Sequence, residues 1–141
     1  MPDVLNFHFD VDGDDFKSAG NASFMVKKNL RQLGLPPELI RRVSIAMYEG
    51  EINMVIHANG GTADVYVSEN YIEIVLCDKG PGIKDIKQAM QEGFSTATDN
   101  IRSLGFGAGM GLPNMKRYTD YMDIDSKVGV GTTITMRVNI N

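Results

Sequence analysis

The sequence has few of the residues that mark secreted, zinc-binding or membrane-spanning proteins. It contains one cysteine, Cys77, and two histidines, His8 and His57. One cysteine cannot form an internal disulfide, and these three side chains lack zinc-site spacing. Cys77, next to Asp78, is expected to be a small buried hydrophobic residue. No apolar run approaches the roughly 20 residues of a membrane span, and the N-terminal "MPDVLNFHFD" has neither the basic nor the apolar region of a signal peptide. We therefore expect a cytoplasmic protein with no membrane partner.

Positive charge is also scarce. The chain has 14 Lys and Arg against 18 Asp and Glu, a formal net charge of −4. A nucleic-acid binder needs a basic face, so we expect no nucleic-acid partner. Hydrophobic residues make up 43% and charged residues 23% of the 141 positions, the composition of a soluble globular protein. This length suits one domain with one core, so we expect a single domain over residues 1–141.

Hydrophobic periodicity predicts the order β-α-α-β-β-(α)-loop-α-β-β. Alternating apolar residues predict a half-buried or edge strand near the N-terminus and a hairpin over residues 62–78. Two further strands, "YMDIDS" and "TTITMRVNI", are joined by the turn "KVGVG". Helices are predicted over Phe16–Leu33, about Glu38–Ala58, about Ile83–Met90 and Leu112–Tyr121, with Gly34 as a stop signal. The expected fold is α+β: a two-layer α/β sandwich with helices on one face of a mainly antiparallel mixed sheet.

Residues 91–111 lack apolar periodicity and carry glycines at alternate positions: Gly105, Gly107, Gly109 and Gly111. Alternating glycines before a helix can present consecutive backbone N–H groups to phosphate. A flexible surface loop is an equally good interpretation of this segment alone. From the same features we expect a mobile lid over about Glu92–Gly109.

The sequence "DKGPGI" follows a run of strand formers. The carboxylate of Asp78, at the strand end, accepts hydrogen bonds, so its partner must donate one, as an exocyclic amine does. Gly80 and Gly82 remove side chains where a flat ring would lie, and Ile83 could line an apolar pocket. A strand-ending turn, in which turn amides satisfy Asp78, is the alternative interpretation.

The second predicted helix carries two polar residues, Glu49 and Asn53, four apart on one face. A carboxylate and an amide oxygen there could serve as general base and Mg²⁺ ligand. A solvated polar stripe is the alternative. His57, one turn further on, extends this polar stripe. A histidine packed in the core is an equally good interpretation of His57. Glu51, close by, is expected to be a surface charge.

Three motifs in this order resemble the N, G1 and G2 boxes of the GHKL (Bergerat-fold) ATPases: Glu49-x-x-x-Asn53, Asp78-x-Gly80-x-Gly82 and Gly107-x-Gly109-x-Gly111-Leu112. Within that superfamily the segments "DKGPGIKDIKQAMQEGFST" and "AGMGLPNMKR" are most similar to anti-sigma regulatory factors and switch-type serine protein kinases. Two features depart from that pattern. Arg102 is the only arginine of the lid, where many anti-sigma kinases carry one just before the last glycines, and the insertion "ATDNIRSLGF" is longer than usual.

The resemblance implies ATP or ADP with Mg²⁺ as ligands. At the adenine end of the nucleotide, Asp78 would accept a hydrogen bond from the adenine amino group, with help from Thr132 through water. Gly80 and Gly82 would let the ring lie against backbone, beside Ile83.

At the phosphate end, the resemblance makes Asn53 the Mg²⁺ ligand and Glu49 the general base. The residues expected to wrap the phosphates and anchor the lid are Gly107, Gly109, Met110, Gly111 and Leu112.

Three functions fit these motifs. The first is a serine protein kinase whose partner is a STAS-domain regulator or a sigma factor. The second is a module that sequesters such a partner with little or no turnover. The third is the stand-alone ATP domain of a split sensor histidine kinase, which would need a partner chain to supply the acceptor histidine. A homodimer is compatible with all three.

Overall fold

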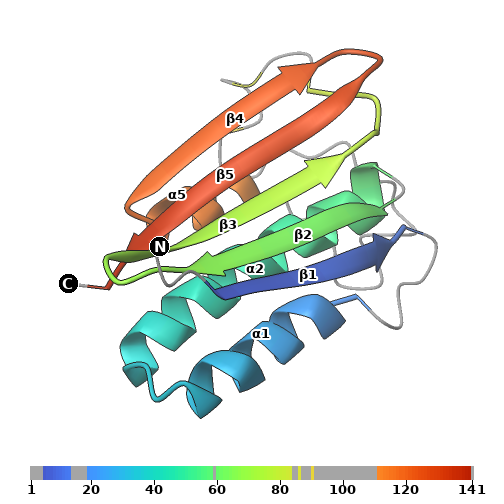
Figure 1. Ribbon diagram of the computed structural model, residues 1–141. Helices are drawn as coiled ribbons and strands as arrows, with labels where there is room; N and C mark the ends of the chain where they lie inside the picture. The colour runs from blue at the N-terminus through green and yellow to red at the C-terminus, as the bar shows by residue number, and fades with distance from the viewer. Residues whose placement is uncertain are drawn as a thin grey trace.

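The protein folds as one sheet with helices on a single face (Figure 1). The computed structural model describes residues 5–13, 19–58, 60–83, 86, 90 and 111–140. Within them the strands are β1 (Leu5–Asp12), β2 (Gly60–Val67), β3 (Tyr71–Asp78), β4 (Tyr121–Lys127) and β5 (Gly131–Asn139). The helices are α1 (Asn21–Gln32), α2 (Pro37–His57) and α5 (Gly111–Arg117). None of these helices is long and apolar enough to cross a membrane.

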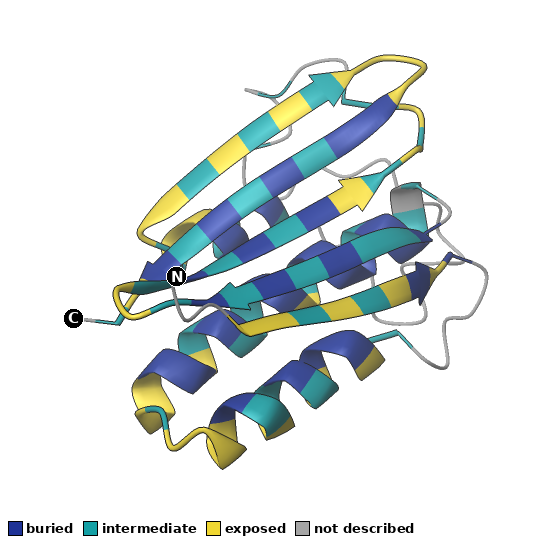
Figure 2. Ribbon diagram, in the orientation of Figure 1, coloured by how far each residue is buried: buried dark blue, intermediate teal, exposed yellow. Residues whose placement is uncertain are grey.

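The five strands lie in the order β1-β2-β3-β5-β4, and every pairing between them is antiparallel. The α+β class is thereby confirmed, and β1 is at an edge of the sheet, as predicted. Figure 2 shows buried residues alternating along the strands. The buried apolar side chains of the three central strands are Ala63, Val65, Val67, Ile72, Ile74, Leu76, Ile134, Met136 and Val138. Their period of two places one apolar face against the helices.

Two predicted helix boundaries were wrong. Helix α1 begins at Asn21 and not at Phe16, because Gly20 has a φ of 95°, a left-handed conformation that a helix cannot continue. Helix α5 ends at Arg117 and not at Tyr121, which starts β4 opposite Arg137. The stop signal at Gly34 is confirmed, with a φ of 76° just after α1.

The segment after β3 is described only in part. The N–H of Met90 donates to the carbonyl of Ile86 at 3.0 Å, the i→i+4 spacing of the short helix predicted there. The predicted lid, with Arg102, Gly107 and Gly109, lies outside the described residues, as does Met110 beside it.

A buried carboxylate joins α1 to α2. Glu51, in the middle of α2, is only 2% exposed, so the expectation of a surface charge was wrong. Its two oxygens accept the backbone N–H groups of Gly20 at 2.9 Å, Ala22 at 3.1 Å and Ser23 at 3.0 Å. These donors belong to the first turn of α1, where N–H groups have no partner within the helix. Glu51 therefore caps α1 from another helix.

Glu51→Ala should lower the free energy of unfolding by about 3 kcal/mol or more, because three buried N–H groups lose a charged acceptor. Glu51→Gln should cost less, since its amide oxygen still accepts while its amide nitrogen cannot. Urea denaturation followed by circular dichroism measures both. Glu38→Ala is the control: this exposed residue of the same helix forms an i,i+3 ion pair with Arg41, and its loss should change stability by less than about 1 kcal/mol. Equal losses in the Glu51→Ala and Glu38→Ala variants would contradict the capping role.

Candidate functional site

The three sequence motifs meet at one end of the helix layer. Gly111, the first residue of α5, packs on Asn53 of α2: a Cβ added to Gly111 would lie 2.8 Å from Asn53 Nδ2. Gly80, just after β3, packs on the end of α2, where an added Cβ would lie 2.6 Å from the Cβ of Ala58. The structure thus brings together residues that lie almost sixty positions apart in the sequence.

Asp78 ends β3 half-buried, with one oxygen fixed by the backbone. Its Oδ1 accepts the N–H of Gly80 at 2.9 Å and that of Thr132, its cross-strand neighbour on β5, at 3.2 Å. Part of the alternative interpretation is thus correct, since a turn amide does satisfy Asp78. Both of these bonds go to Oδ1, so among the described residues Oδ2 is the oxygen open to a ligand.

A second network, missed by the sequence interpretation, supports the chain beyond Asp78. Ser126 Oγ accepts the N–H of Ile83 at 2.7 Å and lies 2.8 Å from Thr132 Oγ1, which is buried. Ser126 follows Met122 and Ile124 on the helix-facing side of β4. A polar residue at an inward position of an alternating strand was the available signal. The network ties Ile83 and Thr132, both predicted site residues, to one hydroxyl.

Gly82 is required by the path of the chain itself. It has a φ of 81°, and an added Cβ would lie 2.5 Å from the carbonyl oxygen of Lys127. The turn between β4 and β5 also bonds to this loop, since Gly129 N–H donates to the carbonyl of Pro81 at 2.9 Å. Gly82 therefore allows the loop after β3 to pack on the β4–β5 turn, a reason independent of any bound ring.

Glu49 faces α5 and is half-buried. The side-chain amide of Asn114 on α5 donates to Glu49 Oε1 at 3.4 Å. Burial raises the pKa of Glu49 above its usual value, and the hydrogen bond from Asn114 opposes that rise. A carboxylate with a raised pKa beside a ligand site is a candidate general base. Asn114 is the second residue that the sequence interpretation missed.

The remaining predicted residues have mixed outcomes. Leu112 is buried in the core. The side chain of His57 lies outside the described residues. Cys77, expected to be a small buried residue, is exposed: it lies on the uncovered face of the sheet, where Thr133 Oγ1 donates to its sulfur at 3.6 Å. In the part of the chain that the structure describes, no three His, Cys, Asp or Glu side chains are grouped as metal ligands.

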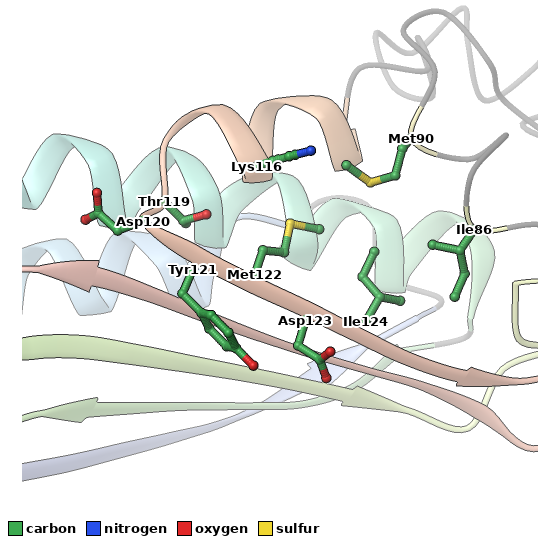
Figure 3. Close-up of a pocket in the computed structure, with 9 residues that line it drawn as sticks. All are labelled: Ile86, Met90, Lys116, Thr119, Asp120, Tyr121, Met122, Asp123 and Ile124. Carbon is green, nitrogen blue, oxygen red and sulfur yellow. The ribbon is translucent and has the colours of Figure 1, made fainter.

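A cavity of about 380 Å³ lies elsewhere, along the edge strand β4 (Figure 3). It is lined by Ile86, Met90, Lys116, Thr119, Asp120, Tyr121, Met122, Asp123 and Ile124. None of the predicted site residues that the structure describes lines this cavity. We therefore assign the candidate site to the cluster of Glu49, Asn53, Asp78 and Gly111, and not to the cavity.

Comparison with known proteins gives consistent matches. The histidine kinase-like ATPase domain family matches residues 15–138. An anti-sigma F factor of Thermoanaerobacter sp. (strain X514) is 31% identical over 137 residues, 94% of this chain and 89% of the relative. The serine/threonine-protein kinase RsbT of Bacillus subtilis (strain 168) is 32% identical over 108 residues, 74% of this chain and 75% of the kinase. The RsbU and RsbW domains of a Mycobacterium tuberculosis protein share the fold, with a TM-score of 0.65 at 16% identity over 95% of this chain and 32% of that one.

Glu49→Gln should make the folded protein slightly more stable at neutral pH. A carboxyl whose pKa is higher in the folded state than in the unfolded state loses stability as pH rises through that interval, because its ionised form is desolvated. The gain from the substitution should therefore be largest at neutral pH and shrink at low pH. Urea denaturation at several pH values between 4 and 7 measures it. Glu51→Gln is the matched control and should lose stability. A similar loss in Glu49→Gln would contradict the inference that burial destabilises the ionised carboxylate of Glu49.

Proposed function

This chain belongs to the histidine kinase-like ATPase domain family, and we propose that it binds ATP and transfers the γ-phosphate to a serine of a partner protein. The observation that carries this proposal is the placement of Glu49. Its half-buried carboxylate lies one helical turn before Asn53, which contacts Gly111 at the start of α5. A base and a polar ligand thus face the segment that the family resemblance assigns to phosphate.

The adenine end of the proposed site is built on Asp78. With Oδ1 occupied by two backbone N–H groups, Oδ2 can accept from the exocyclic amine of adenine. Ile83 and Thr132 are fixed beside it through Ser126. Gly80 and Gly82 keep side chains out of this region, so the chain packing described above and the access of a flat ring require the same residues.

The phosphate end is built on Asn53 and the glycines before α5. The amide oxygen of Asn53 is the type of ligand that Mg²⁺ takes, and this ion is usually held by one or two protein groups together with substrate phosphates and water. Bound there, Mg²⁺ would neutralise part of the negative charge of the phosphates. Gly111 and Leu112 are the described members of the proposed phosphate-binding segment; Gly107, Gly109 and Met110 are included by family resemblance.

The proposed reaction needs one proton transfer to a residue of this chain. Glu49 takes the proton of the serine hydroxyl, the hydroxyl oxygen bonds to the γ-phosphorus, and the bond from that phosphorus to the β–γ bridging oxygen breaks, leaving ADP. Positioning and electrostatics supply most of the catalysis in phosphoryl transfer. A carboxylate with a raised pKa suits the remaining task, since it binds a proton more readily than an exposed one.

The proposed partner is a STAS-domain regulator or a sigma factor of a partner-switching pathway. Relatives named as anti-sigma F factors and as the kinase RsbT support this class of partner. The anti-sigma names also favour a second candidate, sequestration of the partner without turnover. Incubation with γ-labelled ATP and each STAS protein encoded beside its gene separates the two: label on a serine supports the kinase, and a stable unlabelled complex supports sequestration.

Asp78→Asn should weaken ADP binding by about 10- to 100-fold, because the amide can keep the two backbone bonds at Oδ1 but presents a donor where Oδ2 accepted. Isothermal titration calorimetry measures the affinity. Asp125→Asn is the control: Asp125 is exposed on the edge strand β4 and should leave the affinity unchanged. If the Asp78→Asn variant binds ADP as tightly as the wild type, adenine lies elsewhere.

Glu49→Gln should slow partner phosphorylation by about 10²- to 10⁴-fold and leave ADP affinity nearly unchanged, because it removes the base and keeps the shape. Asn53→Ala should reduce both the rate and Mg²⁺-dependent affinity, since it removes a ligand. Single-turnover assays with saturating nucleotide and partner, together with calorimetry, measure the two effects. Wild-type rates in the Glu49→Gln variant would assign the base to another residue.

A further inference from the structure

Helix α5 meets α2 at two neighbouring points of the candidate site. Gly111 packs closely against the side chain of Asn53, and the side-chain amide of Asn114 donates a hydrogen bond to Glu49. Gly111 and Asn114 lie three residues apart on α5, and Glu49 and Asn53 lie four residues apart on α2. The two contacts are therefore about one helical turn apart on each helix. The candidate base and the candidate ligand residue of α2 therefore both lie against the same short helix, and the base accepts a hydrogen bond from it.

We propose that Asn114 is a positioning residue for phosphoryl transfer, whose amide N–H holds Oε1 of Glu49 and leaves Oε2 for the proton of the acceptor hydroxyl. This inference rests on the proposed function. Its basis is the geometry of the contact: Asn114 Nδ2 lies 3.4 Å from Oε1, and the described residues make no other hydrogen bond to this carboxylate.

The chemistry of an amide suits this task better than that of a cation. A half-buried carboxylate has lost part of its hydration, which favours its protonated form. An arginine or lysine beside it would hold it ionised so strongly that it would become a poor base. A single neutral N–H donor stabilises the ionised form weakly and fixes one oxygen. The 3.4 Å separation agrees with such a contact, because catalytic hydrogen bonds often shorten only when the substrate is bound.

The test is the ionisation of Glu49 in Asn114 variants. We expect Asn114→Leu to raise the pKa of Glu49, measured by NMR titration of the ¹³C-labelled glutamate carboxyl in the nucleotide-free protein. Asn114→Asp should raise it further, because a second carboxylate disfavours the charge. Asn114→Gln, which keeps an amide donor, should restore part of the wild-type value. Lys116→Leu is the control, because Lys116 is exposed on the same helix and lines the cavity instead of the site.

The same variants are then assayed for partner phosphorylation across pH. In Asn114→Leu the acid side of the rate profile should move to higher pH, with the rate at its acid end falling by about tenfold, while ADP affinity stays the same. Lys116→Leu should keep the wild-type profile. A general loss of structure would instead lower the rate at every pH without moving the profile.

The two measurements separate failure of the inference from failure of the proposed function. A pKa of Glu49 that is the same in Asn114→Leu as in the wild type would overturn the inference, whether or not the protein is a kinase. A raised pKa together with a wild-type chain that phosphorylates no partner would overturn the proposed function, and with it the catalytic purpose of Asn114. A raised pKa with a shifted rate profile supports both.

Discussion

The arrangement of the helix layer depends on the buried carboxylate of Glu51. A charge that is almost fully buried is costly unless it is hydrogen-bonded, and Glu51 meets this condition with three backbone N–H groups from the first turn of α1. Those N–H groups equally need an acceptor, because Gly20 at the cap position has no side chain to provide one. The two requirements can only be met together, so α1 and α2 are fixed relative to each other. This constraint also determines which side of α2 remains for α5 and the candidate site.

Two glutamates that lie two residues apart on α2 thus have different environments. Residues two apart on a helix do not face each other, so Glu49 lies toward α5 when Glu51 lies toward α1. Glu51 has several strong donors and holds the fold together. Glu49 is half-buried and accepts one long hydrogen bond from the described residues, which leaves its charged form poorly stabilised. The difference between the capping carboxylate of Glu51 and the proposed base Glu49 comes from the number of donors that the neighbouring helix supplies.

Periodicity predicted the type and order of the elements because each signal is local: strands alternate, and α2 is apolar on a broad arc. It also predicted that Asp78 ends a buried strand. The contacts of Glu51 span about thirty positions and require the correct start of α1, which the prediction placed at Phe16. Asn114 and Ser126 act across helices or strands, so their partners follow from packing. Cys77 could have been placed correctly, because Ile72, Ile74 and Leu76 already set the buried face of β3.

The glycines of the Asp-x-Gly-x-Gly motif have a packing role in the fold that does not depend on a bound ligand. Gly80 packs on the end of α2 and Gly82 on the β4–β5 turn, so the two glycines bring both of these segments against the end of β3. That packing fixes the backbone N–H groups of Gly80 and Thr132 on one oxygen of Asp78 and leaves the other open. A substitution at either glycine would therefore shift the acceptor as well as strain the chain. The orientation of the candidate adenine acceptor is a consequence of how this end of the sheet folds, since the bonds that satisfy half of the carboxylate also set the direction of the other half.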